Sequence, residues 1–167
     1  KLTALIFVST IPTILIGYQC KRLVVRSASS HMFSGIGILL TGVILLVVDY
    51  SNINGNKGTR EANFGDAMWM GICQGISVLP GLSRFGLTIS AGLFCGLSRK
   101  FAVKYSLLMS IPAVIGAFFV EAGEFTAVSM TVGKGFTYIL GMIVAGVTGY
   151  LVIRFMLKLS NQVRLRY

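Results

Sequence analysis

The chain has 167 residues, of which 54% are hydrophobic and only 12% are charged, and its mean hydropathy is +0.81. A soluble domain carries about a quarter charged residues, so this composition excludes an ordinary soluble protein and indicates an integral membrane protein. The net charge of +10 would suit nucleic acid in a soluble protein, but here the basic residues lie at the ends of apolar runs. We therefore expect them to set the orientation in the membrane and to contact anionic lipid, and we predict no nucleic-acid partner.

Apolar runs of nearly spanning length predict four transmembrane helices, because about 20 such residues cross a ~30 Å hydrocarbon core. In chain order the four runs are Leu2–Tyr18, Met32–Val48, Phe101–Val120 and Gly135–Ile153. Pro12 should kink the first helix, and the glycines of the second permit close helix packing. A polar loop, 51–63, separates the first pair, within 1–48, from the rest. We expect one all-α membrane domain over 1–167, with the second pair within 101–153.

The apolar segment 64–98 is too long for one crossing and too short for two crossings and a loop. The stretch "LPGLSRFG" divides it into Phe64–Leu79 and Gly86–Ser98, each about 20–24 Å long as a helix. We therefore predict a re-entrant hairpin or a discontinuous helix, which survives at membrane depth only inside protein or beside a water-filled cavity. A count of loop charges favours a single membrane crossing instead. A single crossing, however, would leave part of this apolar segment outside the hydrocarbon core.

An arginine at bilayer depth costs about 2.5–3.5 kcal/mol on insertion scales, so Arg84 needs a partner or a function. It follows the Pro-Gly break and comes just before the second short helix. We expect Ser83, Arg84 and the first amides of that helix, those of residues 86–88, to converge on an anion such as a phosphate or carboxylate. The plainer alternative is that Arg84 extends to the interface and Ser83 only caps a helix.

The stretch "PGLSRFGLTISAGLFCGLSRKFAVKYSLLMSIPAVIGA", residues 80–117, strongly resembles the undecaprenyl-diphosphate phosphatases, the bacitracin-resistance family of bacterial inner membranes. The hallmark of that family is PGxSRSGxT, followed by a helix, an "SR" pair and an "FSFLLSIPxxxGA"-like helix. The preceding "GICQGISVL" and the opening "KLTALIFVSTIPTILIG" also resemble the family. The resemblance therefore covers essentially the whole chain.

The resemblance implies a multi-pass enzyme of the bacterial plasma membrane that hydrolyses undecaprenyl diphosphate to undecaprenyl phosphate and recycles the cell-wall lipid carrier. It implies an inverted-repeat fold with two re-entrant hairpins and an active site between their tips. It also implies that Mg²⁺ supports the activity, and it leaves open whether the protein forms a homodimer. By the same resemblance Ser83, Arg84 and Thr88 match the family's phosphate-binding serine, arginine and threonine and are the predicted catalytic residues. The predicted substrate-binding residues are Gly81, Gly86, Gln74 and Ser77.

The sequence departs from the family pattern in two ways. Phe85 stands where the family usually has a serine, so one hydroxyl near the phosphate is lost. The family's other hairpin, with its acidic residues and histidine, has no counterpart here, and His31, Glu121 and Glu124 do not match those residues. We therefore expect an internal fragment whose magnesium ligands cannot be identified and whose general base and nucleophile lie elsewhere, so that the fragment alone is inactive.

A transporter or flippase of an anionic lipid is the alternative from another functional class. Broken helices whose N-termini face anionic substrates also mark secondary transporters, as do inverted repeats. A purely structural membrane domain leaves the cost of Arg84 unexplained.

Overall fold

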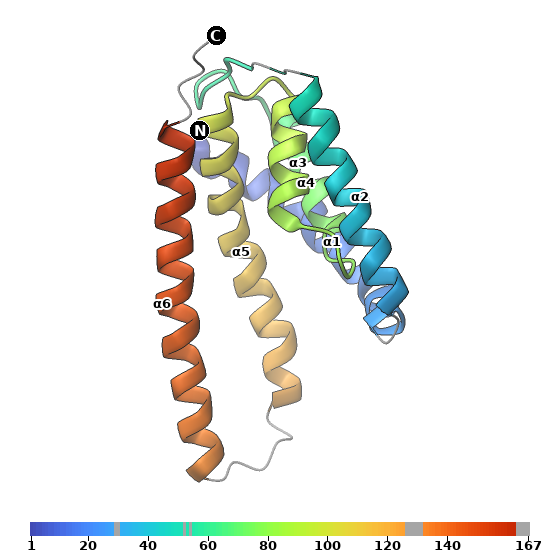
Figure 1. Ribbon diagram of the computed structural model, residues 1–167, viewed down its shortest axis with the longest axis vertical. Coiled ribbons are helices and arrows are strands. Elements are labelled where there is room, and N and C mark those ends of the chain that lie inside the picture. The colour runs from blue at the N-terminus through green and yellow to red at the C-terminus, as the bar shows by residue number, and fades with distance from the viewer. Residues whose placement is uncertain (29–30, 52, 54, 126–131, 163–167) are drawn as a thin grey trace. The chain divides into compact units, whose positions relative to one another are not determined.

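The computed structural model describes every residue except 29–30, 52, 54, 126–131 and 163–167. The described residues form helices joined by turns and loops, with one isolated β-bridge. The helices are α1 (Leu2–Ala28), α2 (His31–Tyr50), α3 (Phe64–Ile76), α4 (Arg84–Phe94), α5 (Arg99–Phe125) and α6 (Val132–Gln162) (Figure 1). The chain divides into two compact units, Lys1–Val114 and Ile115–Tyr167, and the single domain over 1–167 stays a prediction.

In the described part of the chain, four helices are long and apolar enough to cross a membrane, and they correspond to the four predicted spans. Their candidate spans are Leu2–Lys21, His31–Tyr50, Arg99–Val120 and Gly135–Lys158. The helices run further than expected: α1 continues to Ala28, beyond the predicted end at Tyr18. Lysine and arginine are good helix formers and extend their charged ends to the membrane surface, so a helix need not end where its apolar run ends.

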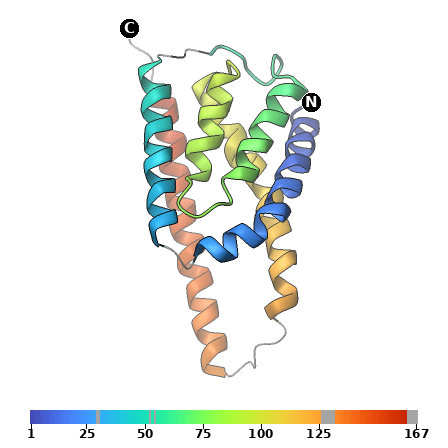
Figure 2. The ribbon, with the colours of Figure 1, turned by 90° about the vertical axis from the view of Figure 1, so that its right-hand side faces the viewer.

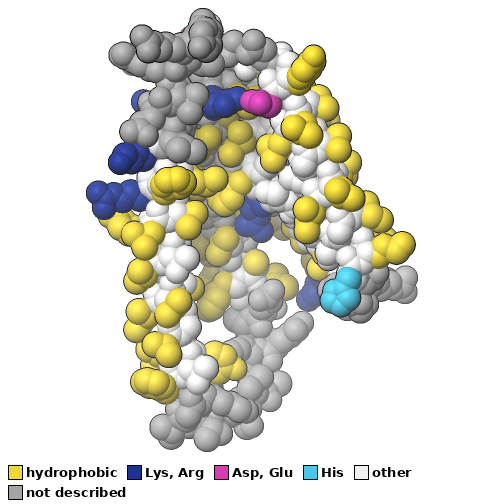
Figure 3. All heavy atoms as spheres, in the orientation of Figure 1, with side chains coloured by type: hydrophobic (Ala, Val, Ile, Leu, Met, Phe, Trp, Pro, Cys, Tyr) yellow, Lys and Arg dark blue, Asp and Glu magenta, His cyan; other side chains and the backbone are white. Residues whose placement is uncertain are grey.

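The exposed side chains of α2 illustrate the face that such a helix offers to lipid. Many of them are large and apolar, and they gather along the outer side of the helix in Figure 3. The most exposed are Tyr50, Met32, Leu39, Leu46 and Ile38. An apolar surface of this extent is unusual on a soluble protein and is the expected surface in a bilayer.

Within Lys1–Val114, the short helices α3 and α4 form an antiparallel hairpin that packs against α1 and α2 (Figure 2). The contact between α1 and α3 is close because α3 presents glycine there: a Cβ at Gly71 would lie 2.2 Å from the carbonyl oxygen of Ser9. One turn later, a Cβ at Gly75 would lie 2.7 Å from that of Ile16. Two glycines four residues apart let helix backbones approach in this way.

The first part of α5 completes this unit through buried hydrogen bonds. The hydroxyl of Tyr105 donates to the carbonyl oxygen of Leu5 at 2.8 Å, which ties α5 to α1. The core around these residues is buried and mostly apolar. It includes Leu5, Met70, Leu97, Ala102, Tyr105 and Met109.

The two ends of the hairpin lie together at its base. The Lys57 amide donates to the Gly96 carbonyl at 3.1 Å, and the Ser98 amide donates to the Lys57 carbonyl at 2.9 Å. These bonds join the polar loop before α3 to the turn after α4, so α3 starts and α4 ends on the same side. The turn between the two helices is therefore the opposite end, which we call the tip (residues 77–83).

The predicted break inside the apolar segment 64–98 is confirmed, but its boundaries differ from those expected. The helix α3 ends at Ile76 rather than Leu79, and α4 runs from Arg84 to Phe94 rather than over 86–98. The second helix starts earlier because Ser83 is its N-cap. It ends earlier because Gly96, with a φ of +80°, closes the helix with a left-handed turn.

Candidate active site

The tip contains a tight turn that the Pro-Gly pair specifies. The Leu82 amide donates to the Leu79 carbonyl at 3.2 Å, and Gly81 has a φ of +85°. Proline at the second position and glycine with positive φ at the third are the requirements of a type II turn. The chain direction therefore reverses here, immediately before Ser83 and Arg84.

The turn rests directly on the backbone of α2. A Cβ at Gly81 would lie 2.1 Å from the Ser34 carbonyl oxygen, and a Cβ at Gly37 would lie 2.7 Å from the Pro80 carbonyl oxygen. Ser34 and Gly37 are three residues apart and share one face of α2, with Thr41 one turn further on. We call these three residues the α2 seat.

Ser83 begins α4 and uses two of the amides that the sequence assigned to a ligand. Its side-chain oxygen accepts from the Gly86 amide at 3.2 Å, and its carbonyl accepts from the Leu87 amide at 2.9 Å. A helix has four amides without helical partners at its start. Among the described residues, those of Arg84 and Phe85 have no partner, so these two amides, rather than those of residues 86–88, are available to an anion.

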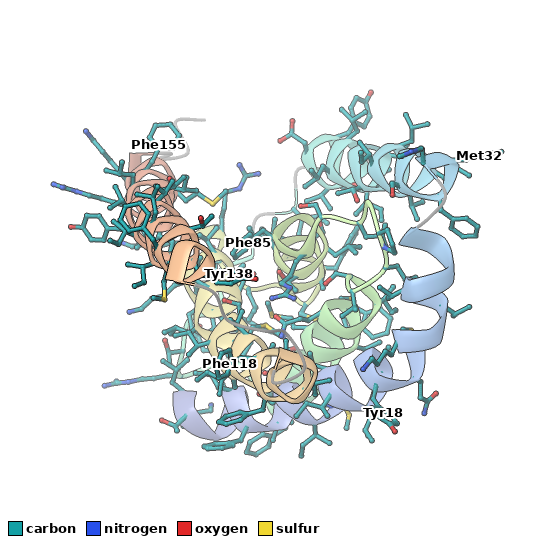
Figure 4. The ribbon with its side chains drawn as sticks, turned by 90° about the horizontal axis from the view of Figure 1, so that it is seen from below. Tyr18, Met32, Phe85, Phe118, Tyr138 and Phe155 are labelled. Carbon is teal, nitrogen blue, oxygen red and sulfur yellow. The ribbon has the colours of Figure 1, made fainter. Side chains whose placement is uncertain are left out.

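Arg84 is the first residue of α4 and is half-buried. Its guanidinium makes no hydrogen bond or ion pair with any residue that the structure describes. Figure 4 labels Phe85, the next residue, at this start of α4. The positive end of a helix dipole, two free amides and an unpaired guanidinium thus occupy one end of the hairpin, a combination that favours an anion.

Thr88 lies one turn after Arg84 and is wholly buried. Its hydroxyl donates to the Arg84 carbonyl at 2.8 Å and also contacts the Ser106 hydroxyl of α5. Its single hydrogen is therefore used within the protein, while Ser83 is an exposed residue. The structure brings Ser83 and Arg84 together at the tip but places the Thr88 side chain behind them, and a phosphate-binding role for Thr88 stays a prediction.

Gln74 lies in the last turn of α3, and Ser77 is the C-cap of that helix, at the start of the tip. Gln74 is 1% exposed; its side-chain nitrogen donates to the Met109 carbonyl at 3.2 Å, and its side-chain oxygen has no partner among the described residues. The Ser77 hydroxyl donates to the Gln74 carbonyl at 2.6 Å. Gly86 is buried against α2, where a Cβ would lie 2.9 Å from Cγ2 of Thr41. Contact of these residues with a substrate also stays a prediction.

Known proteins resemble this chain over its whole length. The profile of the family described as "Bacitracin resistance protein BacA" matches residues 1–167. The chain belongs to the BacA family. A protein of Desulforapulum autotrophicum named "Undecaprenyl-diphosphatase" is 38% identical over 166 residues, covering 98% of this chain and 58% of that protein. One of the same name from Carboxydothermus hydrogenoformans is 35% identical over 169 residues, covering 100% of this chain and 64% of the relative.

A third protein named "Undecaprenyl-diphosphatase", from Methanosphaera stadtmanae, is 36% identical over 155 residues, with 93% of this chain and 55% of the relative covered. The chain therefore spans about three-fifths of the length of the curated BacA relatives that it matches. The sequence-based assignment to this family is confirmed.

The described residues contain no cluster of side chains that could hold a magnesium ion. No group of three His, Cys, Asp or Glu residues is gathered there, and residues 67–98 contain no His, Asp or Glu. Asp66, at the base of the hairpin, is occupied by the Asn63 amide at 3.0 Å and by Lys57 at 3.5 Å. His31 is exposed at the start of α2. The described residues supply no cluster of magnesium ligands, and support of the reaction by Mg²⁺ stays a prediction.

Sequence reasoning missed the residues of α2 and α5 that support the tip. The sequence drew attention to the glycines of the second predicted helix as sites of close packing, but not to what they pack against. The spacing of Ser34, Gly37 and Thr41 on one helix face was a usable signal for a contact surface made of small residues. Nothing local indicated that this surface would meet the Pro-Gly turn, or that Ser106 would meet Thr88.

Proposed function

We propose that this chain forms the phosphate-binding half of an undecaprenyl-diphosphate phosphatase, a multi-pass protein of the bacterial plasma membrane. The reaction is hydrolysis of undecaprenyl diphosphate to undecaprenyl phosphate and phosphate, which recycles the cell-wall lipid carrier. The names of the relatives support the reaction. The observation that carries the location is Arg84, a half-buried guanidinium without a partner in the described chain, next to two free amides.

The hairpin is re-entrant in this proposal. The helices α3 and α4 have 13 and 11 residues, so they are about 20 and 16 Å long and fall short of a ~30 Å hydrocarbon core. The bonds between Lys57 and the turn at Gly96 support entry and exit on one face, with the tip inside the membrane. The tip is protected at that depth because α2 covers its backbone. By family resemblance, an inverted repeat supplies the opposing hairpin.

The chemistry of the tip fits displacement at the terminal phosphorus of a diphosphate. Catalysis of that kind depends on positioning the phosphate and on neutralising charge at its non-bridging oxygens. Arg84 would bind two of those oxygens with its planar fork, and the free amides would bind another. The Ser83 oxygen accepts from the Gly86 amide, which leaves its hydrogen free for the phosphate. Residues 67–98 contain no histidine, aspartate or glutamate that could activate water, so the general base would come from the rest of the protein.

Binding of farnesyl diphosphate to the chain in detergent micelles tests this proposal. Hydrogen bonds to charged groups contribute about 1.5–3 kcal/mol, so Arg84→Gln should weaken binding roughly 10- to 100-fold. Arg84→Lys should recover only part of the loss, because an ammonium cannot bind two oxygens with a rigid fork.

Arg99→Gln is the matched control for this experiment. Arg99 is the first residue of α5, lies beyond the base of the hairpin and pairs with Asp49 at 3.8 Å. It should bind farnesyl diphosphate within about twofold of the unsubstituted chain, a difference of only ~0.4 kcal/mol. Equal affinities for the Arg84→Gln and unsubstituted chains would contradict the proposal.

Phosphate release by the chain alone tests where the general base lies. We expect none above background from the chain alone, because a single positioned donor supplies only about 10²–10³-fold acceleration and phosphate hydrolysis needs far more. Robust turnover by the chain would contradict the assignment of the base to another part of the protein. Transfer of the intact diphosphate lipid across sealed vesicles would favour a lipid transporter instead.

A further inference from the structure

The two helices of the hairpin begin with the same kind of cap but complete it differently. At the start of α3, the Asp66 amide donates to the Asn63 side chain at 2.8 Å, and the Asn63 amide donates back to the Asp66 side chain at 3.0 Å. This reciprocal pair is a capping box made within one helix. At the start of α4, Ser83 accepts from the Gly86 amide, but Gly86 has no side chain that could accept from the Ser83 amide in return.

Thr41 of the α2 seat supplies the missing acceptor. The Ser83 amide donates to Oγ1 of Thr41 at 3.1 Å. The same hydroxyl donates its hydrogen to the Gly37 carbonyl at 2.9 Å, which leaves its lone pairs for Ser83. Because a Cβ at Gly86 would lie 2.9 Å from Cγ2 of Thr41, the absence of a side chain at Gly86 is what makes room for Thr41.

We propose that Thr41 is a positioning residue for the diphosphate site, because it completes the α4 cap from a neighbouring helix and so fixes Ser83 and Arg84. This inference rests on the proposed function of the tip. Thr41 is 5% exposed, so it acts through Ser83 and not by contact with the phosphate. The packing contacts of Ser34 and Gly37 hold the tip against α2. Thr41 adds a hydrogen bond that sets the direction of the first turn of α4.

Without the Thr41 hydroxyl, the Ser83 amide loses its hydrogen-bond acceptor. An amide that loses its acceptor favours a backbone rotation toward another one. Such a rotation turns the Ser83 hydroxyl and the amides of Arg84 and Phe85 away from a common point. Misplacement of about 1 Å in a site of this kind is enough to lose much of its effect.

The test uses Thr41→Val, which keeps the shape of the side chain and removes its hydroxyl, and Thr41→Ser, which restores the hydroxyl. Thr13→Val is a closely matched control, because Thr13 is also a buried threonine on a neighbouring helix. It bonds to the carbonyl four residues earlier and, at 2.9 Å, to the Gly71 carbonyl across the helix contact. Affinity for farnesyl diphosphate and the melting temperature are measured for each variant in the same detergent.

We expect Thr41→Val to weaken farnesyl diphosphate binding about five- to tenfold, and Thr41→Ser to bind within about twofold of the unsubstituted chain. Thr13→Val should lower the melting temperature about as much as Thr41→Val while leaving the affinity unchanged. Unchanged affinity in Thr41→Val, or an equal loss in Thr13→Val, would overturn the role of Thr41. If the Arg84→Gln variant also binds as tightly as the unsubstituted chain, the proposed function fails together with the role of Thr41. If Arg84→Gln loses affinity and Thr41→Val does not, the proposed function stands and only the role of Thr41 fails.

Discussion

The tip and the base of the α3–α4 hairpin are both closed by a glycine in the left-handed region, Gly81 with a φ of +85° and Gly96 with a φ of +80°. Their surroundings differ. At the base, the Gly96 amide donates to the Leu93 carbonyl at 2.8 Å and the Leu97 amide to the Gly92 carbonyl at 3.0 Å. This pair of bonds is a Schellman motif, so the helix that precedes the base turn specifies it.

The tip turn, in contrast, depends on another helix. A Cβ at Gly96 would meet nothing nearer than the Lys57 side chain at 3.7 Å, whereas a Cβ at Gly81 would meet the Ser34 backbone at 2.1 Å. Two glycines with nearly the same φ therefore differ in what a larger residue would collide with. The base turn is closed by its own helix and paired with the polar loop at Lys57, whereas the tip turn packs on α2, so changes in α2 should be felt at Ser83 and Arg84.

The largest expected effect separates the two glycines directly. A left-handed conformation costs an L-residue about 1–2 kcal/mol, and overpacking adds about 1–3 kcal/mol. Gly81→Ala should therefore lower the free energy of unfolding by about 2–5 kcal/mol, and Gly96→Ala by about 1–2 kcal/mol. Titration with a denaturing detergent, followed by circular dichroism, measures both. Equal losses would show that the contact with Ser34 contributes nothing.

The next effect tests the same contact from the side of α2. Gly37→Ala places a methyl group 2.7 Å from the Pro80 carbonyl oxygen, so we expect a loss of about 1–3 kcal/mol from overpacking and weaker binding of farnesyl diphosphate. Gly42→Ala is the control on the same helix, because nothing lies within 4 Å of its Cβ position. It should gain up to about 0.5–1 kcal/mol from helix propensity. A Gly37→Ala variant as stable as Gly42→Ala would contradict the α2 seat.

Local signals in the sequence were sufficient to predict the spans and the break. Four apolar runs predicted the four long helices, and the Pro80-Gly81 pair predicted the break between the two short ones. Ser83 was identified as a helix cap in one of the two interpretations of the motif, and the structure has it as the cap of α4. Each of these features depends on residues within a few positions of one another, which a single sequence displays.

The features that were not predicted depend on residues far apart in the chain. Thr41 and Ser83 are separated by 42 positions, and no local pattern assigns one to the other. The amides expected to face a ligand differ from those that are free, because Ser83 accepts from two of the expected ones, which depends on a two-residue difference in where α4 starts. The end of α1 at Ala28 was missed because the predicted boundary followed hydrophobicity rather than helix propensity.

The smallest expected effect concerns the N-cap of α3, at the base of the hairpin. Asn63→Ala removes one half of the capping box of α3, which lies at the base and receives nothing from α2. We expect a loss of about 1 kcal/mol in the free energy of unfolding, the usual value for an N-cap, and unchanged affinity for farnesyl diphosphate. Thr41→Val, which also removes one hydrogen bond from a helix cap, should instead change affinity. If the two variants weakened binding alike, general loosening of the hairpin would explain both, and the tip would not differ from the base in the way that its contacts with α2 imply.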